Sequence, residues 1–205
     1  MEQRAPKTRE KILESGQREF LDKGFLRASL RMIVREAGVT TGAFYGYFSS
    51  KEALFDALVE KEETFFMTRF IQAQKAFTLL EPQEQTRQLG DVSRNCMLEL
   101  MDYMYSHRQA FLLLLTKAEG TKHQDFVHRL VEIEAEGTHR YLDVLAKLGS
   151  PVQSMAPWLE HVLLSGMFSA YFEPLLHDVG REEAMDMVKQ IQAFYLAGWK
   201  QLMGV

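Results

Sequence analysis

Apolar residues recur every three to four positions along almost all of this 205-residue chain. That spacing is the period of an α-helix, and no stretch of the sequence shows the strict alternation of a half-buried β-strand. In the first periodic segment the apolar positions are Ile12, Leu13, Phe20 and Leu21. Later helices are expected at 84–106, 107–118, 122–148, 155–176 and 181–203. The sequence therefore predicts an all-α protein of about nine helices.

Residues that begin and end helices divide the N-terminal quarter into short elements. Gly24 is a stop signal for the first helix, and Gly38 is a stop signal for a helix of about two turns that Ser29 opens as its N-cap. Ser49, followed three residues later by Glu52, has the pattern of a capping box. This pattern predicts a long helix that begins near residue 50 and runs to about residue 77.

Two short helices joined by a tight turn, at 30–37 and 40–47, are typical of a helix-turn-helix, whose second helix enters the major groove of DNA. The apolar residues that would hold the pair together are Leu30, Ile33, Val34, Ala37, Val39, Phe44 and Phe48. The remaining face of the second helix is uncharged but can form hydrogen bonds, and it carries Tyr45 and Tyr47. The alternative is that these tyrosines are half-buried packing residues.

Charge is distributed unevenly along the chain. The formal net charge is −4 and the pI is about 5.9, values that by themselves do not favour a nucleic-acid binder. Residues 1–51, however, hold ten lysines and arginines against six acidic residues, whereas the remainder holds 14 against 22. Such an asymmetry is typical of a basic binding module joined to an acidic body.

The N-terminal stretch resembles the DNA-binding domain of TetR-type (TetR/AcrR) bacterial regulators. The matching residues are Thr8 to Gly24 with Phe20 and Phe25, Ser29, the block Ile33-Val34-x-x-Ala37-Gly38-Val39, the block Gly42-x-Phe44-Tyr45-x-Tyr47-Phe48, and Ser50-Lys51-Glu52-x-Leu54. The resemblance implies a DNA-binding domain at 1–52 and a helical domain for ligand binding and dimerisation at 53–205. It also implies a homodimeric repressor that places one reading helix in each half of a palindromic operator.

The resemblance assigns DNA contacts by position. It places at the DNA Thr40, Thr41, Gly42, Ala43, Tyr45, Gly46 and Tyr47. Further candidates for phosphate contacts are Arg27, Ser29, Arg31 and Lys51, and Arg4, Lys7 and Arg9 form a basic arm. Lys51 begins the long helix, where an ammonium group and the helix amides can meet one phosphate. Many relatives carry a basic residue at the position of Thr41 and a larger side chain at the position of Gly46. Because this chain has smaller, uncharged residues there, fewer direct contacts to bases are expected from this helix.

The C-terminal helices are expected to form a ligand pocket and a dimer interface, as the resemblance implies. The pocket candidates are Met97, Met101, Met104, Phe111, Tyr141, Phe168 and Phe172. The interface candidates are Trp158, Val162, Ser165, Gly166, Ile191, Phe194, Tyr195 and Gly198. Methionine-rich apolar surfaces suit adaptable binding sites, so a small and largely apolar ligand is expected. The alternative for each of these residues is plain core packing.

Other chemistry has little support in the sequence. We expect no enzyme activity, cofactor or metal site, because the histidines lack further ligands at a recognised spacing and no nucleophile has a partner. Cys96 is expected to be a buried apolar thiol, and Glu132, Glu134 and Glu136 are expected to face solvent. The longest apolar run has six residues, so no membrane span is expected and the predicted location is the cytoplasm.

Three functions remain open from the sequence. The first is a transcriptional regulator that a small molecule releases from its operator. The second is an all-α carrier of small molecules that keeps the N-terminal domain only as a scaffold. The third is a DNA-binding protein of low sequence preference, which the residues Thr41 and Gly46 suggest.

Overall fold

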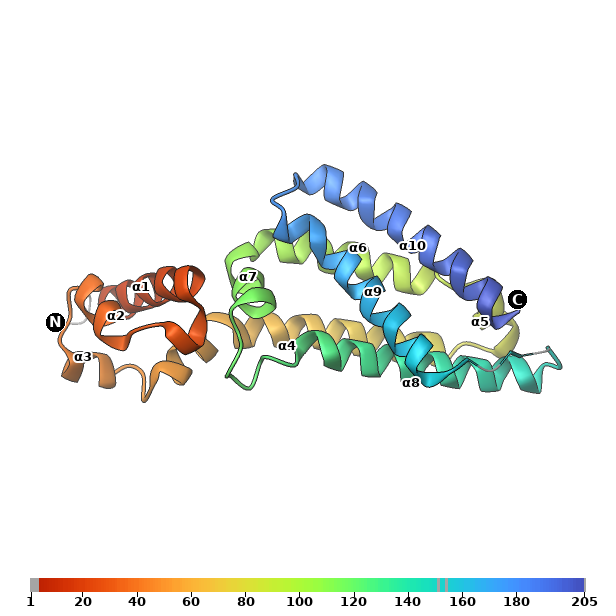
Figure 1. Ribbon diagram of the computed structural model, residues 1–205, viewed down its shortest axis with the longest axis horizontal. Helices are drawn as coiled ribbons and strands as arrows, with labels where there is room; N and C mark the ends of the chain where they lie inside the picture. Colours follow the sequence, from red (N-terminus) through yellow and green to blue (C-terminus); the bar gives the residue numbers. More distant parts are fainter. Residues whose placement is uncertain (1–3, 151, 154, 205) are drawn as a thin grey trace. The chain divides into compact units, whose positions relative to one another are not determined.

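The computed structural model describes residues 4–150, 152–153 and 155–204, which contain helices and no β-strand. The helices are α1 (Arg4–Arg27), α2 (Leu30–Glu36), α3 (Thr41–Tyr45), α4 (Lys51–Thr78), α5 (Pro82–Arg87), α6 (Asp91–Ser106), α7 (Arg108–Thr116), α8 (Phe126–Lys147), α9 (Pro157–Leu176) and α10 (Arg181–Met203) (Figure 1). The predicted all-α fold is confirmed. The expected helix at 84–106 is two helices, because the chain turns at Gly90 with a φ of 89°.

The helices gather into two compact units. The first contains Met1–Thr64 and His107–Phe126, and the second contains Phe65–Ser106 and Val127–Val205. The long helix α4 therefore contributes its N-terminal half to the first unit and its C-terminal half to the second. The functional boundary predicted between residues 52 and 53 stays a prediction.

Phenylalanine side chains form the centre of the first unit. The rings of Phe20 and Phe25 each meet the ring of Phe55 edge-on, with centroid distances of 5.1 and 5.5 Å. Ile33 of α2 and Leu113 of α7 are buried in the same core. The core thus joins α1, α2, α4 and α7, and it supports the two short helices that the sequence singled out.

The caps that the sequence predicts in the N-terminal quarter are found at two of three places. Ser29 accepts a hydrogen bond from the backbone N–H of Met32 and begins α2, as expected. Gly38 follows the end of α2 with a φ of 66°, a conformation that favours glycine. The expected cap at Ser49 is wrong: the Ser50 hydroxyl accepts from the Ala53 N–H at 3.1 Å, so α4 begins one residue later.

Tyrosine hydroxyls tie the helices of the second unit together. Tyr171 of α9 donates to the carbonyl oxygen of Met97 in α6 at 2.8 Å. Tyr105 of α6 donates to the carbonyl oxygen of Val179 at 2.7 Å, in the turn between α9 and α10. These bonds fix α6, α9 and the start of α10 as one framework. None of the described helices has the length and apolar character needed to cross a membrane.

Candidate nucleic-acid interface and ligand cavity

The second helix of the helix-turn-helix is held by its buried side and leaves its other side free. Phe44 is fully buried, Phe48 is 5% exposed, and their rings lie 5.8 Å apart. Thr40 caps α3, because its hydroxyl oxygen accepts a hydrogen bond from the Ala43 N–H at 3.1 Å. The polar residue at the start of the helix, Phe44 within it and Phe48 just after it therefore set the direction of α3.

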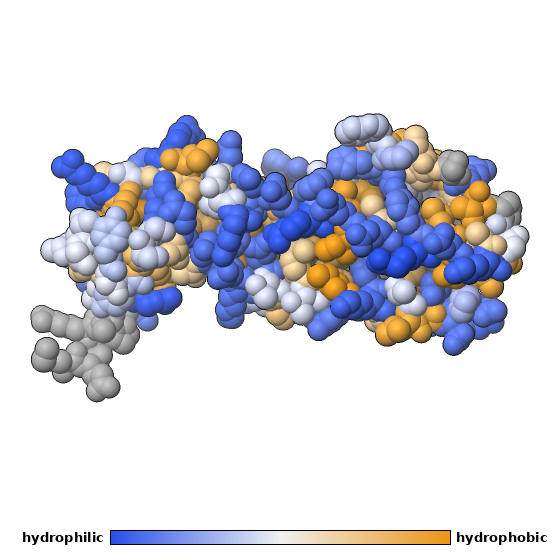
Figure 2. Space-filling view, turned by 90° about the horizontal axis from the view of Figure 1, so that it is seen from below, coloured by the Kyte–Doolittle hydropathy of each residue, from blue (hydrophilic) through white to orange (hydrophobic). Residues whose placement is uncertain are grey.

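The outward face of α3 is uncharged, exposed and able to form hydrogen bonds. Tyr45 is 53% exposed and Tyr47 is 37% exposed, so both hydroxyls are accessible. The other predicted contacts on this face are exposed too, except for the half-buried Ala43: Thr40, Thr41, Gly42 and Gly46. In Figure 2, pale surface of intermediate hydropathy lies over the part of the first unit that contains α3, beside blue and orange surface. This face can approach DNA without electrostatic repulsion, but it offers no charged base contact.

Cationic side chains lie beside the start of α2. Arg27 and Arg31 are exposed, and the Arg27 Nε donates to the Lys23 carbonyl oxygen at 3.2 Å. Ser29 is half-buried, and its backbone N–H donates to the Glu19 carboxylate at 2.9 Å. Burial favours the neutral form of Glu19, but hydrogen bonds from Lys23 and Ser29 outweigh it and lower the pKa of Glu19. The charged Glu19 therefore fixes the loop that presents Ser29.

Lys51 has a structural partner that the sequence did not reveal. Its ammonium group donates to the carbonyl oxygens of Phe25 and Ala28, at 2.7 and 3.1 Å, and lies 4.4 Å from the centre of the Phe25 ring. Lys51 thus ties the start of α4 to the turn between α1 and α2. Two of its three N–H groups are used in this way, and one remains for the predicted phosphate contact.

The expected basic arm is helical where the structure describes it. Lys7 and Arg9 lie within α1, and the Arg9 guanidinium lies 5.5 Å from the centre of the Phe48 ring. The side chain of Arg4 lies outside the part of the chain that is described in that detail.

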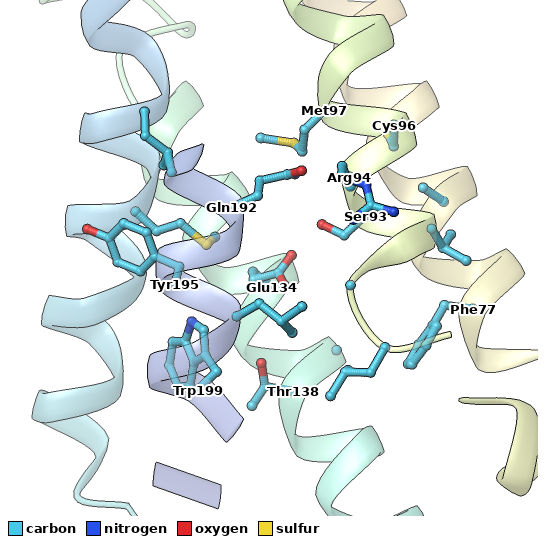
Figure 3. A pocket seen from close by; sticks show the side chains of 18 of the residues that line it. Phe77, Ser93, Arg94, Cys96, Met97, Glu134, Thr138, Gln192, Tyr195 and Trp199 are labelled. Carbon is cyan, nitrogen blue, oxygen red and sulfur yellow. The ribbon is translucent and has the colours of Figure 1, made fainter. Parts of the chain in front are cut away.

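The second unit contains a partly open cavity of about 390 Å³ between α4, α6, α8, α9 and α10 (Figure 3). Its walls are largely apolar and aromatic, with Phe77 of α4 and Trp199 of α10 on facing sides. Three of the predicted pocket residues line it, namely Met97, Tyr141 and Phe168. Three others, Met101, Met104 and Phe172, are buried but do not line this cavity. Phe111 belongs to the first unit.

The cavity also contains polar side chains that the sequence did not predict as pocket residues. Glu134 of α8 faces the cavity, and the amide nitrogen of Gln74 in α4 donates to its carboxylate at 2.5 Å. Burial raises the pKa of Glu134 to about 7, and the bond from Gln74 only partly opposes that rise. The expectation that Glu134 faces solvent is therefore wrong, whereas Glu132 and Glu136 are exposed.

A second set of apolar residues lies on the surface of α9 and α10. Trp158 is 79% exposed, Val162 is 60% exposed and Phe194 is 73% exposed. Ser165 and Gly166 are half-buried, and Gly198 is exposed. Ile191 and Tyr195, also predicted for the dimer interface, are half-buried and line the cavity. Two large aromatic side chains, Trp158 and Phe194, are thus exposed on this helix pair.

The remaining candidate groups have structural roles. Cys96 is buried as expected, and burial raises the pKa of its thiol to about 11. His123 is buried between two carboxylates of α4, with its Nδ1 against Glu63 and its Nε2 2.9 Å from Asp56. This contact holds the segment after α7 against α4. Within the described residues no group of three or more side chains is arranged to hold a metal ion.

The structure thus combines a helix-turn-helix, supported by the core of the first unit, with a second helical unit that contains a cavity. Residues 12–58 match the sequence model of a family described as bacterial regulatory proteins, tetR family. The likeness to this family therefore lies in the N-terminal residues of the chain.

Known regulators resemble this chain in sequence over a short stretch. YvdT of Bacillus subtilis, an uncharacterized HTH-type transcriptional regulator, is 47% identical over 51 residues, which are 25% of this chain and 26% of YvdT. TtgR of Pseudomonas putida, an HTH-type transcriptional regulator, is 41% identical over 56 residues, which are 27% of each chain. The matches thus span roughly a quarter of these relatives, which are regulators rather than enzymes.

Likeness over the whole chain is a likeness of fold. Salmonella enterica GusR superposes with a TM-score of 0.56 at 15% sequence identity, covering 97% of this chain and 96% of GusR. At this level of sequence identity, the likeness over the whole chain shows a shared fold.

Proposed function

We propose that this protein is a DNA-binding transcriptional regulator that acts as a homodimeric repressor and leaves a palindromic operator when a small molecule fills its cavity. The observation that carries the proposal is the exposed, hydrogen-bonding face of α3, together with the exposed cations Arg27 and Arg31 beside the start of α2. Such a helix can enter a major groove while the cations contact the flanking phosphates.

Helix α4 offers the route from ligand to DNA. Its first residue, Lys51, is bonded to the turn before α2, and its C-terminal half supplies Phe70, Gln74 and Phe77 to the cavity wall. A ligand that displaces the C-terminal half of α4 would therefore act on the element that supports the reading helix. By linkage, operator DNA would weaken ligand binding by the same factor.

The homodimer is supported by the exposed apolar residues of α9 and α10. Two copies of this helix pair, related by a twofold axis, would bury Trp158, Val162 and Phe194 against their counterparts. Such a dimer presents two copies of α3, which a palindromic operator requires.

Binding to the DNA upstream of the protein's own gene tests the proposal. A fluorescent duplex of that region is titrated with protein at several salt concentrations, with an excess of random duplex as competitor. Tight binding that survives the competitor supports a sequence-specific regulator. Binding that the competitor removes would instead favour the low-preference DNA binder, and no binding at low salt would contradict the proposal and favour the carrier.

Substitutions locate the contact surface in the same assay. Arg31→Ala and Tyr47→Ala should each weaken binding by about tenfold, because each removes a contact worth roughly 1 kcal/mol or more. Arg87→Ala, an exposed arginine on α5, is the matched control and should leave affinity unchanged. Equal effects of Arg31→Ala and Arg87→Ala would contradict the assignment of the interface.

A further inference from the structure

The cavity of the second unit contains an acidic group without a basic partner. Glu134 accepts a hydrogen bond from Gln74, and among the described residues no lysine, arginine or histidine pairs with its carboxylate. An ionised carboxylate in largely apolar surroundings is costly unless a cation or several donors compensate it. The cavity is therefore electrostatically incomplete as it stands.

A second polar group in the wall of the cavity has unmet hydrogen-bonding capacity. Within the described part of the chain, the side-chain oxygen of Gln192 is buried without a hydrogen-bond partner. In Figure 3, the side chains of Glu134 and Gln192 both project into the space between α6, α8 and α10. Buried polar groups are nearly always paired, so a molecule that donates hydrogen bonds would satisfy both side chains.

The basic residues of the cavity wall do not neutralise Glu134. Arg94 and Lys189 are exposed, and each pairs with an acidic residue one helical turn away, Asp91 and Asp186 respectively. Lys200 is exposed as well. These cations lie at the solvent side of the wall, whereas the apolar interior contains the carboxylate.

We propose that the cavity binds an apolar or aromatic molecule with a protonated amine, whose ammonium group lies against Glu134 and donates a further hydrogen bond to Gln192. This assignment rests on the proposed function, since it names the class of small molecule that the regulator senses. Aromatic walls such as Phe77 and Trp199 suit the apolar body and attract a cation. A volume of about 390 Å³ accommodates a molecule of two rings or more.

Calorimetric titration with three probes of one shape tests the assignment. The probes are 1-naphthylmethylamine, a cation, 1-naphthalenemethanol, which is neutral, and 1-naphthoate, an anion. The amine should bind the full-length protein at least tenfold more tightly than the alcohol, and the naphthoate should bind most weakly. Equal or tighter binding of the alcohol or the naphthoate would overturn the assignment, as would no binding of the amine at millimolar concentration.

Two variants of one helix isolate the role of the carboxylate. Glu134→Gln should remove the preference for the amine over the alcohol, because an amide keeps the shape and loses the charge. Glu136→Gln, an exposed carboxylate on the same helix, is the matched control and should keep the preference. A preference that survives in Glu134→Gln would contradict the assignment. Circular dichroism confirms that both variants are folded.

The unmodified protein provides an independent measurement through pH. The other titratable groups of the described lining are Arg94, Cys96, Tyr141, Tyr171, Lys189, Tyr195 and Lys200, so Glu134 is the sole carboxyl or imidazole group among them. Because the pKa of Glu134 is raised to about 7, affinity for the amine should rise about tenfold from pH 6 to pH 8. Affinity for the alcohol should stay constant. A pH-independent amine affinity would count against Glu134.

The DNA assay tests the proposed function, and the calorimetry tests the ligand class, so the two proposals can be contradicted independently. Loss of the proposed function would appear as absent DNA binding, while binding of the amine could still be measured. A wrong ligand class would appear as the wrong order of the three probes in a protein that binds its operator.

Discussion

At the scale of single residues, the structure gives definite roles to side chains that the sequence pattern could not place. Lys51 shows this best, because its position predicted a phosphate contact while its ammonium bonds two carbonyl oxygens 23 and 26 residues earlier in the chain. Glu134 is a second case. Residues of a helix are separated by about 100°, so Glu134 lies on the opposite side from Glu132, and Glu136 lies near Glu132. Helix geometry thus separates Glu134 from the other two glutamates, and the structure shows that its side is the one that faces the cavity.

Lys51→Met should lower the free energy of unfolding by about 1–3 kcal/mol, because two carbonyl oxygens lose a charged donor while the aliphatic stem is kept. Urea denaturation measures this change. Lys61→Met, an exposed lysine of the same helix, is the control and should be nearly neutral. A Lys51→Met protein as stable as the unmodified one would show that the tie to α1 contributes little.

Glu134→Gln should raise stability at pH 8 and leave it unchanged at pH 4. The pKa of Glu134 in the folded protein, about 7, lies above its ordinary value of 4.5, so the folded state favours the neutral acid. The native protein therefore loses stability as pH rises from about 4.5 to 7, by an amount on the order of 3 kcal/mol. The glutamine variant avoids that loss. Thermal unfolding of both proteins without ligand, at pH 4 and pH 8, measures this effect. If the Glu134 carboxyl were well solvated, the stability difference between the two proteins would be the same at both pH values.

At the scale of elements, the sequence predicted helices well and their partners poorly. Capping residues and glycines located α2 and α3, since these signals act within one turn of the chain. The break at Gly90 was missed because its cause is the left-handed turn between α5 and α6, and no proline marks it. The cavity residues were only partly predictable, because helical periodicity distinguishes the buried side of a helix but not which buried residues border a void.

Gly42→Ala should stabilise α3 and weaken DNA binding. Gly42 has helical backbone angles, and a methyl group there would meet only the Thr40 hydroxyl, at 4.0 Å. Replacing glycine by alanine inside a helix stabilises by roughly 0.5–1 kcal/mol. The same methyl group lies on the exposed face and would hinder close approach of the helix to DNA. Thermal unfolding and the duplex titration measure the two effects, and unchanged DNA affinity would show that the backbone at Gly42 is not close to DNA.

At the scale of the whole molecule, the proposed homodimer can be tested by changing one exposed apolar residue of α10. Phe194→Glu should convert the proposed dimer to a monomer, because it places a charge in each copy of an apolar surface that the proposed interface would bury. Light scattering after size-exclusion chromatography measures the mass. Leu79→Glu, at a residue 85% exposed outside α9 and α10, is the control and should remain dimeric. A Phe194→Glu protein that stays dimeric would show that another surface associates.

The first unit is assembled from two separate stretches of sequence, and this has a consequence for the newly made chain. Leu113 and Ala118 complete the core under α1 and α2, yet they follow more than 40 residues that belong to the second unit. A ribosome adds residues in order. Part of the apolar core of the first 64 residues therefore stays uncovered until the segment 107–126 has emerged. The core that Phe44 of α3 joins is therefore complete only when more than half of the polypeptide has been synthesised. Proteases and chaperones would encounter the N-terminal region in that interval.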